Sequence, residues 1–357
     1  MQTSSETSAP PRLSVCLPVY NFGAFLGQTL DSILPQAETH EGVEVIVVDG
    51  ASTDDTQAVV AARQARHPRL RYVRLDRKGG IDADMARSVE LATGRYCWLF
   101  SGDDIMRPGA IESVLRWTES DCDLYICRHA NCDLHMRHLG DHPVFRDDVV
   151  RTADLADAGQ RLAYLQAAAT TEALFSFMSG LILRRDTWLS VPAVEEFMGS
   201  CWGHVARLLS LCERRLTVCY TAEILLDKRG DNDSFMQRGL VHRLGIGVWG
   251  FARLAERFFG AGTTETLEVI RLLRTEVGIG YLLYARIKVA EAPERESMAE
   301  LDRIAVLLHG GAGWRRRLSL YAYRHTPLPV ARLLGAVHFA LLDWRARASG
   351  RRGADGR

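Results

Sequence analysis

The sequence has no excess of charge of either sign. Its 357 residues contain 44 lysines and arginines and 44 aspartates and glutamates. The protein as a whole therefore generates no field that would attract nucleic acid, and we expect no nucleic-acid partner. The charge is unevenly spread, however, because Ala312–Arg357 has ten arginines against two aspartates. Such a basic run most often forms a solvated face, but it also suits an anionic membrane surface.

Closely spaced cysteine pairs are absent as well. None of the eight cysteines forms a CxxC pair, the spacing typical of zinc sites and redox centres. Several lie in apolar runs, such as Cys16 within Leu13–Val19. We therefore expect reduced, buried thiols in a cytosolic protein.

The sequence also has no long apolar segment. Residues 1–11 are polar and rich in Ser, Thr and Pro, unlike a signal peptide. The best candidate for a membrane span, Leu328–Leu342, is too short and contains Arg332. These features predict a cytoplasmic protein, with peripheral membrane contact through the basic segment 312–357 as an additional expectation.

Apolar runs alternate with helix-like segments in the first third of the chain. Strands are predicted at Leu13–Val19, Val43–Val48, Leu70–Leu75 and Tyr96–Phe100, with helices at Phe25–Leu34, from Ser52 through Ala65, and at Asp84–Thr93. This alternation predicts an α/β domain with a parallel sheet and right-handed crossovers. Ligands of such sheets bind beyond the carboxyl ends of the strands.

The rest of the chain is mainly helical in pattern. We expect a helix at Ile111–Trp117 and strands at Leu124–Cys127 and Ser179–Leu183, whereas residues 128–160 show no clear pattern. Further helices are expected at Val205–Cys212, Arg238–Phe259 and Leu267–Ala290.

The strongest local feature is Ser101–Asp104, which follows a predicted strand. Asp103 and Asp104 are adjacent carboxylates that repel each other unless a positive charge lies nearby. A divalent cation that holds a diphosphate would supply that charge, and Mg²⁺ and Mn²⁺ prefer oxygen ligands. A turn or a helix cap is the structural alternative, since aspartate is common in both.

A second acidic strand end lies at Asp49–Asp54. Asp49 ends a buried strand, where its carboxylate can accept hydrogen bonds from a base or a ribose. The following residues, Ser52–Asp55, suit the capping of the next helix. Neither acidic strand end has the GxGxxG of a dinucleotide site, and the chain has no GxxxxGK[ST] phosphate loop. These absences count against a dehydrogenase and an ATPase.

Several segments together resemble the family 2 glycosyltransferases with the GT-A fold. The resemblance covers roughly residues 12 to 120, and the order and spacing of the segments agree with the family. They are Pro18–Asn21 for P-x-Y-N, Ser32–Gln36 for S-I-x-x-Q, Asp49–Asp54 for D-D-G-S-x-D, Ala92–Tyr96 for A-x-G-x-Y, and Ser101–Asp104 for D-x-D-D.

Three departures from the family pattern are visible. Gly50 stands where the second aspartate of a pair is usual, and Ser101 replaces the first aspartate of the D-x-D motif. Gly80–Asp84 replaces the usual Ala-Arg-Asn stretch. This variant, together with Tyr96–Ser101, resembles the subgroup that contains O-antigen abequosyltransferases.

The resemblance implies a set of donor-binding residues. Pro18 and Tyr20 would line the base pocket, Asp49 would bind the base, and Asp82 or Asp84 would lie by the diphosphate or ribose. The same set includes Asn21, Gly102 and Arg229, the last of these in the basic loop with which family members often close the donor site. Because Ser101 has no carboxylate, the Mg²⁺ or Mn²⁺ ion would fall to Asp103, with Asp104 as a second ligand. Arg229 also has a structural alternative, an ordinary surface turn.

The family normally inverts at the anomeric carbon and needs a base for the acceptor hydroxyl. The base is usually a carboxylate well downstream of the metal motif, and His204 occupies roughly that place here. The near-neutral pKa of histidine suits this work, but a structural histidine is the alternative. Glu195 and Glu196 are reserve candidates, and Asp104 completes the catalytic set.

The sequence therefore predicts a GT-A Rossmann-like nucleotide-diphospho-sugar transferase domain with a mainly helical C-terminal extension. We expect a disordered tail at 1–11, a nucleotide-sugar half at 12–120, an acceptor half at 121–235, a helical extension at 236–311, and a basic tail at 312–357. The predicted enzyme is a hexosyl- or deoxyhexosyltransferase that uses a nucleotide-diphosphate sugar and a glycan or lipid-linked glycan in surface-polysaccharide synthesis. Two alternatives stay open: a nucleotidyltransferase on a similar fold, and a degenerate GT-A module that binds sugar without catalysis.

Overall fold

The computed structural model describes residues 10–294 and 296–333. Within it the chain divides into two compact units, Met1–Asn232 and Asp233–Arg357. The division falls beside the expected end of the acceptor half at residue 235. Each unit is described by itself.

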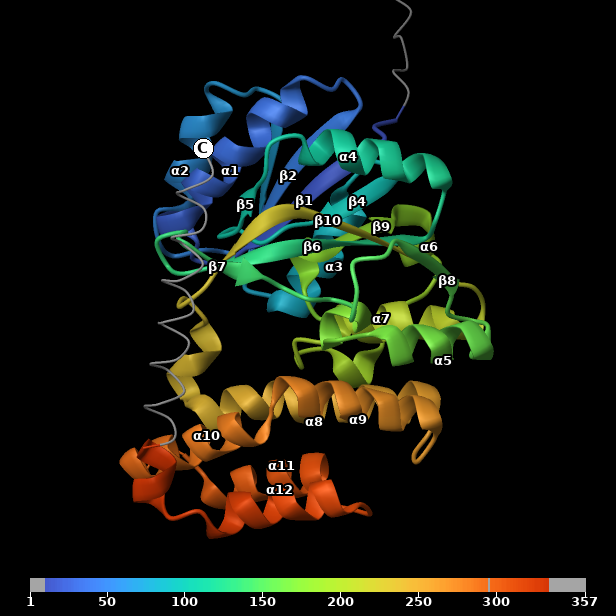
Figure 1. The fold of residues 1–357 in the computed structure, drawn as a ribbon. Helices are drawn as coiled ribbons and strands as arrows, with labels where there is room; N and C mark the ends of the chain where they lie inside the picture. The colour runs from blue at the N-terminus through green and yellow to red at the C-terminus, as the bar shows by residue number, and fades with distance from the viewer. Residues whose placement is uncertain (1–9, 295, 334–357) are drawn as a thin grey trace, which may run out of the picture. The chain divides into compact units, whose positions relative to one another are not determined.

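A mixed sheet of ten strands forms the centre of the first unit (Figure 1). Its main path runs β3-β2-β1-β4-β9-β6-β10-β5, with β7 paired to β6 and β8 paired to β10. The strands are β1 Leu13–Val19, β2 Val43–Asp49, β3 Leu70–Arg74, β4 Tyr96–Leu99, β5 Ile105–Met106, β6 Leu124–Cys132, β7 His138–Asp141, β8 Arg151–Asp154, β9 Leu181–Arg184 and β10 Thr217–Arg229.

The two central strands end at the same edge of the sheet. β1 and β2 are parallel, and Val19 pairs with Asp49 at their carboxyl ends. Every residue of both strands is buried, as expected for strands covered on both faces. β4 lies on the other side of β1 in parallel, so the loop that follows it opens at the same edge.

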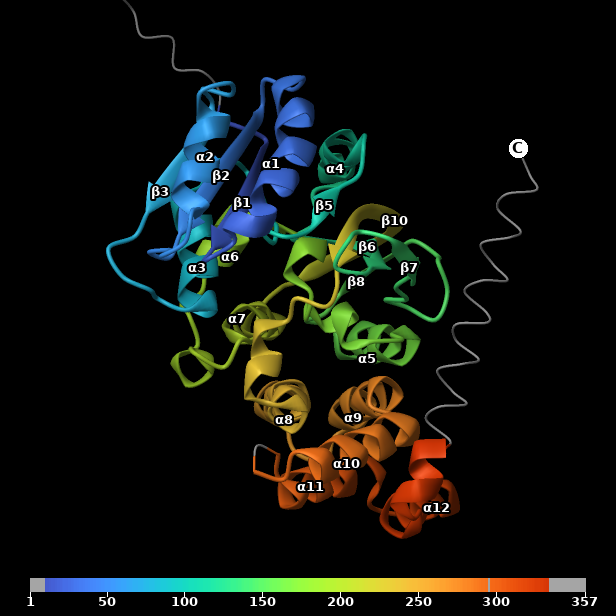
Figure 2. The ribbon, with the colours of Figure 1, turned by 90° about the vertical axis from the view of Figure 1, so that its left-hand side faces the viewer.

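Helices cover both faces of this sheet. Alternate β1 residues, from Leu13 to Val19, join one core with α1 residues such as Leu30 and with Ile111 of α4. The opposite face of β1 and β2 packs against α3, as the end-on view in Figure 2 shows. The helices of the first unit are α1 Gly23–Glu38, α2 Thr56–Gln64, α3 Ile81–Leu91, α4 Ala110–Trp117, α5 Ala158–Ala167, α6 Arg185–Leu189 and α7 Gly203–Ser210.

The second half of this unit depends on one long strand. β10 runs parallel to β6 over most of its length and antiparallel to β5 near its end. The Leu226–Met106 pair brings the strand back beside the chain that follows the acidic loop 101–104. β10 therefore carries residues 228–232 to the edge where β1, β2 and β4 end.

The second unit is helical over the residues that the structure describes. Its helices are α8 Leu240–Phe259, α9 Thr264–Glu276, α10 Ile279–Glu291, α11 Met298–His309 and α12 Trp314–His325. The single helix expected at Leu267–Ala290 is two helices, because the chain leaves the helical conformation at Val277 and Gly278. Gly278 and Gly280 are weak helix formers, so the break costs little.

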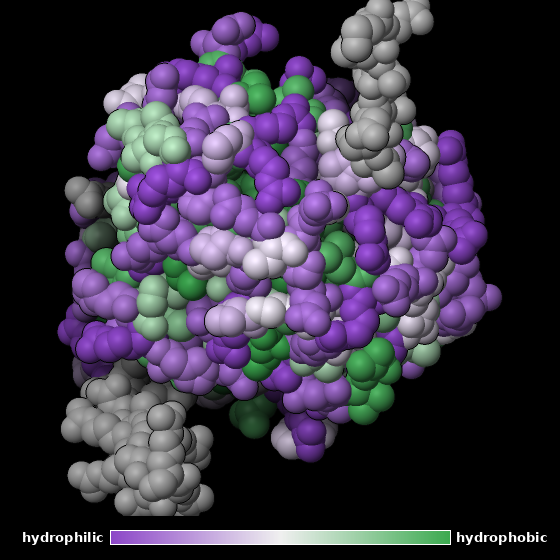
Figure 3. All heavy atoms as spheres, turned by 90° about the horizontal axis from the view of Figure 1, so that it is seen from above, coloured by the Kyte–Doolittle hydropathy of each residue, from purple (hydrophilic) through white to green (hydrophobic). Residues whose placement is uncertain are grey.

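The predicted fold class is confirmed, since helices flank a mixed sheet and the C-terminal part is helical. No helix among residues 10–294 and 296–333 is long and apolar enough to cross a membrane. The face shown in Figure 3 is mostly hydrophilic, with small separate apolar patches. Scattered patches of this kind are ordinary on a folded chain. The basic segment 334–357 and most of Leu328–Leu342 lie outside the described residues.

Candidate active site

Three loops meet at the carboxyl edge of the sheet. The Asn21 amide N–H donates to Ser52 Oγ at 2.9 Å, and the Thr53 N–H donates to Asn21 Oδ1 at 2.8 Å. Asn21 has a positive φ of 58°, a conformation that asparagine tolerates better than most residues. Asn21 thus joins the β1 and β2 loops to each other, which is a structural task rather than the expected contact with the donor.

Gly102 brings the third loop against the first. A Cβ at this position would lie 2.9 Å from Val19 Cγ1 and 3.1 Å from the Phe22 ring. Its carbonyl oxygen also accepts a hydrogen bond from Thr29 Oγ1 at 3.0 Å. The absence of a side chain therefore permits the close approach of the metal-motif loop to the end of β1.

The two residues predicted for the base pocket differ in exposure. Pro18 is buried inside β1, opposite Val48, so it shapes the strand and does not face the edge. Tyr20 is half-buried, and the Lys78 Nζ lies 3.7 Å from the centre of its ring. An aromatic face with a cation beside it is a surface on which a nucleotide base and its phosphates can bind.

Asp49 is fully buried and heavily hydrogen-bonded. Its Oδ1 accepts from the Ser52 N–H at 2.7 Å. Its Oδ2 accepts from Tyr72 Oη at 2.6 Å and from the Arg74 guanidinium at 2.9 Å. Burial and this carboxylate raise the pKa of Tyr72 to about 12. Asp49 thus organises Tyr72 and Arg74 at the edge, and direct contact with a base stays a prediction.

Asp84 lies in the space that Gly50 leaves open. A Cβ at Gly50 would be 2.6 Å from Asp84 Oδ2, and one at Gly79 would be 2.8 Å from Asp84 Oδ1. The side chain is 4% exposed, and its Oδ1 has no hydrogen-bond partner. Burial raises the pKa of this carboxyl group. The carboxylate missing at position 50 is therefore supplied from helix α3, at nearly the same point.

Asp82 has a different role from the one expected. Its two oxygens accept hydrogen bonds from the backbone N–H groups of Gly199, Cys201 and Gly203, at 2.8, 3.0 and 2.9 Å. A carboxylate at the start of α7 also interacts favourably with the helix dipole. Asp82 thus fastens the 199–203 loop to α3, and its lone pairs are used in doing so. Donor binding by Asp82 stays a prediction, since these contacts engage the carboxylate with the protein itself.

Asp103 is the accessible member of the acidic pair. It is partly exposed, with Oδ1 in contact with Ser101 Oγ and Oδ2 in contact with the Asn232 side-chain amide. Asn232 comes from the end of the first unit, just beyond β10. Oxygen atoms from three separate positions can therefore converge at this loop, if the Asn232 amide presents its oxygen.

Asp104 turns into the protein instead. It is 2% exposed, and its oxygens accept from Ser179 Oγ at 2.7 Å and from the Arg229 N–H at 3.1 Å. Burial, followed by the nearby charge of Asp103, raises the pKa of Asp104 well above its ordinary value. Burial and two engaged oxygens favour a structural role, so the metal and catalytic roles of Asp104 stay predictions.

Arg229 is a structural residue. Its guanidinium donates to the carbonyls of Asp103 and Leu134, at 3.0 and 2.6 Å, and to Gln28 Oε1 at 2.7 Å. The side chain is buried, with its backbone N–H on Asp104. Its donors point to the chain itself, and the contact with a donor phosphate stays a prediction.

His204 is a buried residue. It is 4% exposed, its Nε2 donates to the Phe175 carbonyl at 3.0 Å, and its Nδ1 is buried without a partner. Burial lowers its pKa, so the ring is neutral. The buried ring and its contact with the Phe175 carbonyl favour a structural role, so catalysis by His204 stays a prediction. Glu196, on an exposed turn at Glu195–Phe197, stays a prediction.

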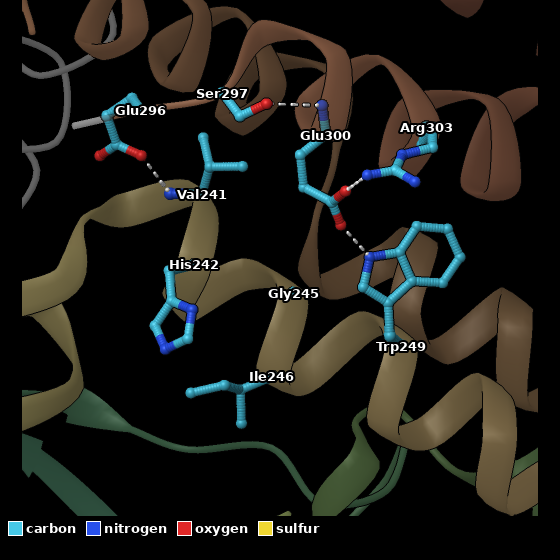
Figure 4. Close-up of a pocket in the computed structure, with 9 residues that line it drawn as sticks. All are labelled: Val241, His242, Gly245, Ile246, Trp249, Glu296, Ser297, Glu300 and Arg303. Atoms are coloured by element: carbon cyan, nitrogen blue, oxygen red, sulfur yellow. Dashed lines mark hydrogen bonds and ion pairs between the residues drawn. The ribbon is translucent and has the colours of Figure 1, made fainter. Parts of the chain in front are cut away.

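A cavity of about 490 Å³ in the second unit lies between α8 and α11 (Figure 4). Its acidic groups are already engaged with the protein. Glu296 accepts from the backbone N–H of Val241 at 2.9 Å, and Glu300 accepts from Trp249 Nε1 at 2.5 Å and pairs with Arg303. These contacts join the two helices, and we assign no ligand to this groove.

Another cavity, of about 520 Å³, adjoins the acidic loop in the first unit. It is lined by Asn131 and Cys132 of β6, Leu139–Asp141 of β7, Lys228 and Arg229 of β10, and Gly230 just after it. Arg229 connects this wall to Asp103 directly. The cavity therefore lies on the side of the sheet edge opposite Tyr20 and Asp84.

Sequence reasoning missed Lys78, Asn232 and Ser179. Lys78 follows β3 and reaches Tyr20, which is far away in sequence. Ser179 binds Asp104, and its hydroxyl also accepts from the Ser101 N–H at 2.9 Å. Asn232 lies three residues after Arg229, the last residue of β10. No local pattern marks these residues, because each acts across a long-range contact.

The donor set at this edge fits a hard divalent cation. Mg²⁺ typically takes one or two protein carboxylates and completes its shell with waters and substrate phosphates. One accessible carboxylate, Asp103, with a serine hydroxyl and an amide nearby, corresponds to that arrangement.

The fold and the edge define a class of protein, an α/β transferase domain that binds its donor where β1, β2 and β4 end. Residues 14–169 match the family model "Glycosyl transferase family 2". The chain is 28% identical over 293 residues to the abequosyltransferase RfbV of Salmonella typhimurium, which covers 81% of this chain and 87% of that protein. It is 31% identical over 122 residues to the glycosyltransferase GlyG of Streptococcus pneumoniae, across 34% of this chain and 40% of that one.

Solved structures show the same fold. TarS 1-349 of S. aureus in complex with UDP-GlcNAc matches with a TM-score of 0.55 at 14% identity, over 92% of both chains. The mannosyltransferase PcManGT of Pyrobaculum calidifontis, in complex with GDP-Man and Mn²⁺, matches with a TM-score of 0.53 at 19% identity, over 92% and 88%. The chain is therefore a glycosyltransferase on the GT-A fold, whose residues 14–169 match family 2 and whose sequence is similar to an abequosyltransferase.

Proposed function

We propose that this glycosyltransferase moves one hexosyl or deoxyhexosyl residue from a nucleotide-diphosphate donor to a hydroxyl of a glycan or lipid-linked glycan. The main support is the convergence of Tyr20, Asp84 and Asp103 on the edge where three strands end. The similarity to an abequosyltransferase supports a deoxyhexose as the sugar and a surface polysaccharide as the product.

In this proposal the donor lies along the edge from Tyr20 to Asp103. The base stacks on the Tyr20 ring, and the Lys78 ammonium moves from that ring to the phosphates. Asp84, with its buried and unpartnered Oδ1, accepts a hydrogen bond from a ribose hydroxyl. Such a bond stabilises the bound donor because it satisfies a polar atom that otherwise stays buried without a partner.

Asp103 would hold the divalent cation, with Ser101 and Asn232 beside it. A bound Mg²⁺ or Mn²⁺ supplies positive charge to the diphosphate that leaves the anomeric carbon. Arg229 keeps the loop in place by binding the Asp103 carbonyl, while Ser179 fixes Asp104 behind it. Glu196 is the base that we propose for the acceptor hydroxyl in an inverting displacement.

The acceptor enters the cavity between β6, β7 and β10. Asp141 and Asn131 offer hydrogen bonds to sugar hydroxyls, and Lys228 offers a charge for an anionic group of the acceptor. Because Arg229 joins this cavity to the Asp103 loop, the acceptor would lie next to the diphosphate end of the donor rather than its base end.

The test is transfer and donor hydrolysis by the purified chain, measured with a panel of nucleotide-diphosphate sugars with and without Mn²⁺. Hydrolysis that depends on the metal and gives way to transfer on adding acceptor would support the proposal. Donor binding by calorimetry without hydrolysis or transfer would instead favour the non-catalytic module. Release of pyrophosphate from a nucleoside triphosphate would favour a nucleotidyltransferase.

We also propose that α12 lies on an anionic membrane surface during this reaction. Trp314, Leu318 and Tyr321 are 69%, 57% and 61% exposed along the helix, at spacings of four and three residues. Arg315–Arg317 and Arg324 accompany this apolar stripe. A helix with aromatic and aliphatic side chains among arginines is typical of interfacial binding.

Sedimentation with vesicles tests the membrane proposal. The chain should bind vesicles that contain phosphatidylglycerol and bind pure phosphatidylcholine much less. The triple variant Trp314→Ser, Leu318→Ser, Tyr321→Ser should lose binding without loss of donor hydrolysis. Equal binding of the variant and the wild type would contradict the proposal.

A further inference from the structure

Two histidines and a glutamate meet inside the first unit, next to Asn131 of the cavity between β6, β7 and β10. His129 comes from β6, His142 follows β7, and Glu172 lies on the short turn Thr171–Leu174. One ligand atom from each of the three lies within 4.8 Å of the others. Three segments that are far apart in sequence therefore bring two imidazoles and a carboxylate to one point.

The separations in this cluster are those of metal ligands. His129 Nδ1 lies 3.4 Å from Glu172 Oε2, and His142 Nε2 lies 3.3 Å from Glu172 Oε1. Ligands bound to zinc at about 2.0–2.1 Å in a tetrahedron are roughly 3.3–3.4 Å from each other. Both facing nitrogens, His129 Nδ1 and His142 Nε2, have no hydrogen-bond partner.

Asn131 determines the protonation of the rings. Its amide faces His129 Nε2 through Oδ1 at 3.2 Å and His142 Nδ1 through Nδ2 at 3.4 Å. An amide oxygen only accepts and an amide nitrogen only donates, so the His129 hydrogen is on Nε2, and a neutral His142 also carries its hydrogen on Nε2, which faces Glu172. His129 Nδ1 is then a bare lone pair that faces a carboxylate inside the protein, where His129 is 0% exposed.

Two like lone pairs at this distance repel unless a proton or a metal ion lies between them, and His129 Nδ1 faces Glu172 Oε2 in this way. A neutral imidazole with a bare ring nitrogen is the form in which histidine binds metals.

We propose that His129, His142 and Glu172 form a second metal site, distinct from Asp103, which takes Zn²⁺. Nitrogen ligands suit a borderline cation such as zinc, whereas the oxygen atoms around Asp103 suit Mg²⁺ or Mn²⁺. Water completes the coordination, since three protein ligands leave one tetrahedral position open.

Binding requires one side-chain movement. The His129 and His142 rings are stacked at 4.7 Å with an interplanar angle of 13°, so their in-plane lone pairs do not converge on one ion. The His142 side chain is 24% exposed and can turn its ring out of the stack, releasing its contact with Asn131. His129 keeps its orientation, because Asn131 and the Phe177 ring at 4.3 Å hold it.

The ion would fasten the wall of the acceptor cavity. Asn131, which binds both histidines, also lines that cavity, and the ion would join β6 to the chain after β7 and to the 171–174 turn. Lys228 adds a positive charge on the same side and lowers the affinity for any cation. We therefore assign the site a structural role in the acceptor half, and it does not depend on the proposed function.

The experiment is equilibrium dialysis of the full chain against Zn²⁺ alone, with bound metal measured by mass spectrometry. Wild type should bind one equivalent that Asp103→Asn retains. His142→Ala and Glu172→Gln should weaken binding by more than about 10–100-fold, the loss that even outer-shell substitutions cause. His138→Ala is the matched control, because His138 is an exposed histidine on β7, and it should bind zinc as wild type does.

Thermal unfolding gives an independent measurement on the same proteins. Zn²⁺ should raise the Tm of wild type, Asp103→Asn and His138→Ala, and should leave that of His142→Ala and Glu172→Gln unchanged. His142→Ala replaces a partly exposed side chain, so it should fold, and circular dichroism checks this. The proposal is overturned if the zinc equivalent disappears in Asp103→Asn, or if the folded His142→Ala variant binds zinc as wild type does.

Discussion

The two halves of the first unit are built by different means. Between β1 and β4, each strand is followed by a helix and pairs with a near neighbour, as the order β3-β2-β1-β4 shows. Beyond residue 120, β9, β6 and β10 interleave, and β10 pairs with three other strands. The first half is made from local units, whereas the second is made from long-range pairings.

This difference determines which functional residues can be located from the sequence alone. In the first half the carboxylates follow strands directly, so chain position alone locates them at the edge. In the second half the contacts of Arg229 and Asn232 depend on where β10 returns to the sheet. The predictions below test the two halves against each other, from the largest expected effect to the smallest.

The sharpest contrast is between the neighbours Asp103 and Asp104. Asp103→Asn should lower kcat by about 10²–10³-fold, the loss typical of removing one electrostatic contact to the leaving group. Asp104→Asn should retain most of the activity, because Asp104 is buried and its amide analogue can still accept from Arg229. Steady-state kinetics with Mn²⁺ measure both. Equal losses in the two variants would place both residues on the metal.

Substitution of Arg229 tests whether its hydrogen bonds stabilise the contact between the two halves of the first unit. Arg229→Met removes donors from two carbonyls and one side-chain amide, and buried acceptors left unpaired cost about 1–3 kcal/mol each. We expect unfolding in urea to show a loss of about 3 kcal/mol. Arg238→Met, in the second unit, is the control and should change little. If Arg229→Met is as stable as the wild type but binds the donor weakly, Arg229 contacts a phosphate of the donor instead.

The exchange between Gly50 and Asp84 tests the donor half. Asp84→Ala should weaken nucleotide binding by about 10–100-fold, as expected for a lost hydrogen bond to a charged group. Gly50→Asp alone should weaken nucleotide binding further, because its Cβ would lie 2.6 Å from Asp84 Oδ2. The double variant Gly50→Asp, Asp84→Ala should recover part of the affinity by calorimetry. Additive losses would show that the two positions do not share one function.

His204 gives the smallest effect on catalysis and tests the acceptor half. His204→Gln should keep turnover within about 3-fold, whereas loss of a base would cost about 10²–10⁴-fold. The pKa of His204 is lowered on folding, so the folded state binds fewer protons. Its contribution to stability is fully present above the unfolded pKa of about 6.5 and is lost progressively as pH falls below that value toward the folded pKa. Below pH 6.5 the unfolding free energy of the variant should therefore fall less steeply with decreasing pH than that of the wild type, by up to about 1.4 kcal/mol per pH unit. The same dependence of unfolding free energy on pH in both proteins would contradict a buried, neutral His204.

The donor half was largely predictable because its signals are local. Asp49 and Asp103 each lie at or just after the end of an apolar run. Such a run is enough to predict a buried parallel strand, and therefore the position of the aspartate at the strand end. Asp82 and Asp84 looked alike in sequence, since both lie in the first turn of α3. The structure separates them: one oxygen of Asp84 stays unpartnered beside Gly50, while Asp82 binds three backbone amides.

The acceptor half was less predictable for a physical reason. Burial decides the role of His204, and burial depends on packing that no short window of sequence reports. The same applies to Arg229, whose partners Gln28, Asp103 and Leu134 come from three separate segments. A charged residue in a polar loop looks the same whether it faces solvent or closes a buried network.

The Arg229 network has a consequence for the order of binding. One guanidinium holds the loop of Asp103, helix α1 through Gln28, and the chain at Leu134 beside the acceptor cavity. Any movement of the metal-motif loop is therefore transmitted to both of the other segments. A donor that immobilises this loop would also immobilise the acceptor wall, and thus lower the entropic cost of the second association. The kinetic scheme expected from this connection is sequential and ordered, with the nucleotide sugar first on and the free nucleotide last off.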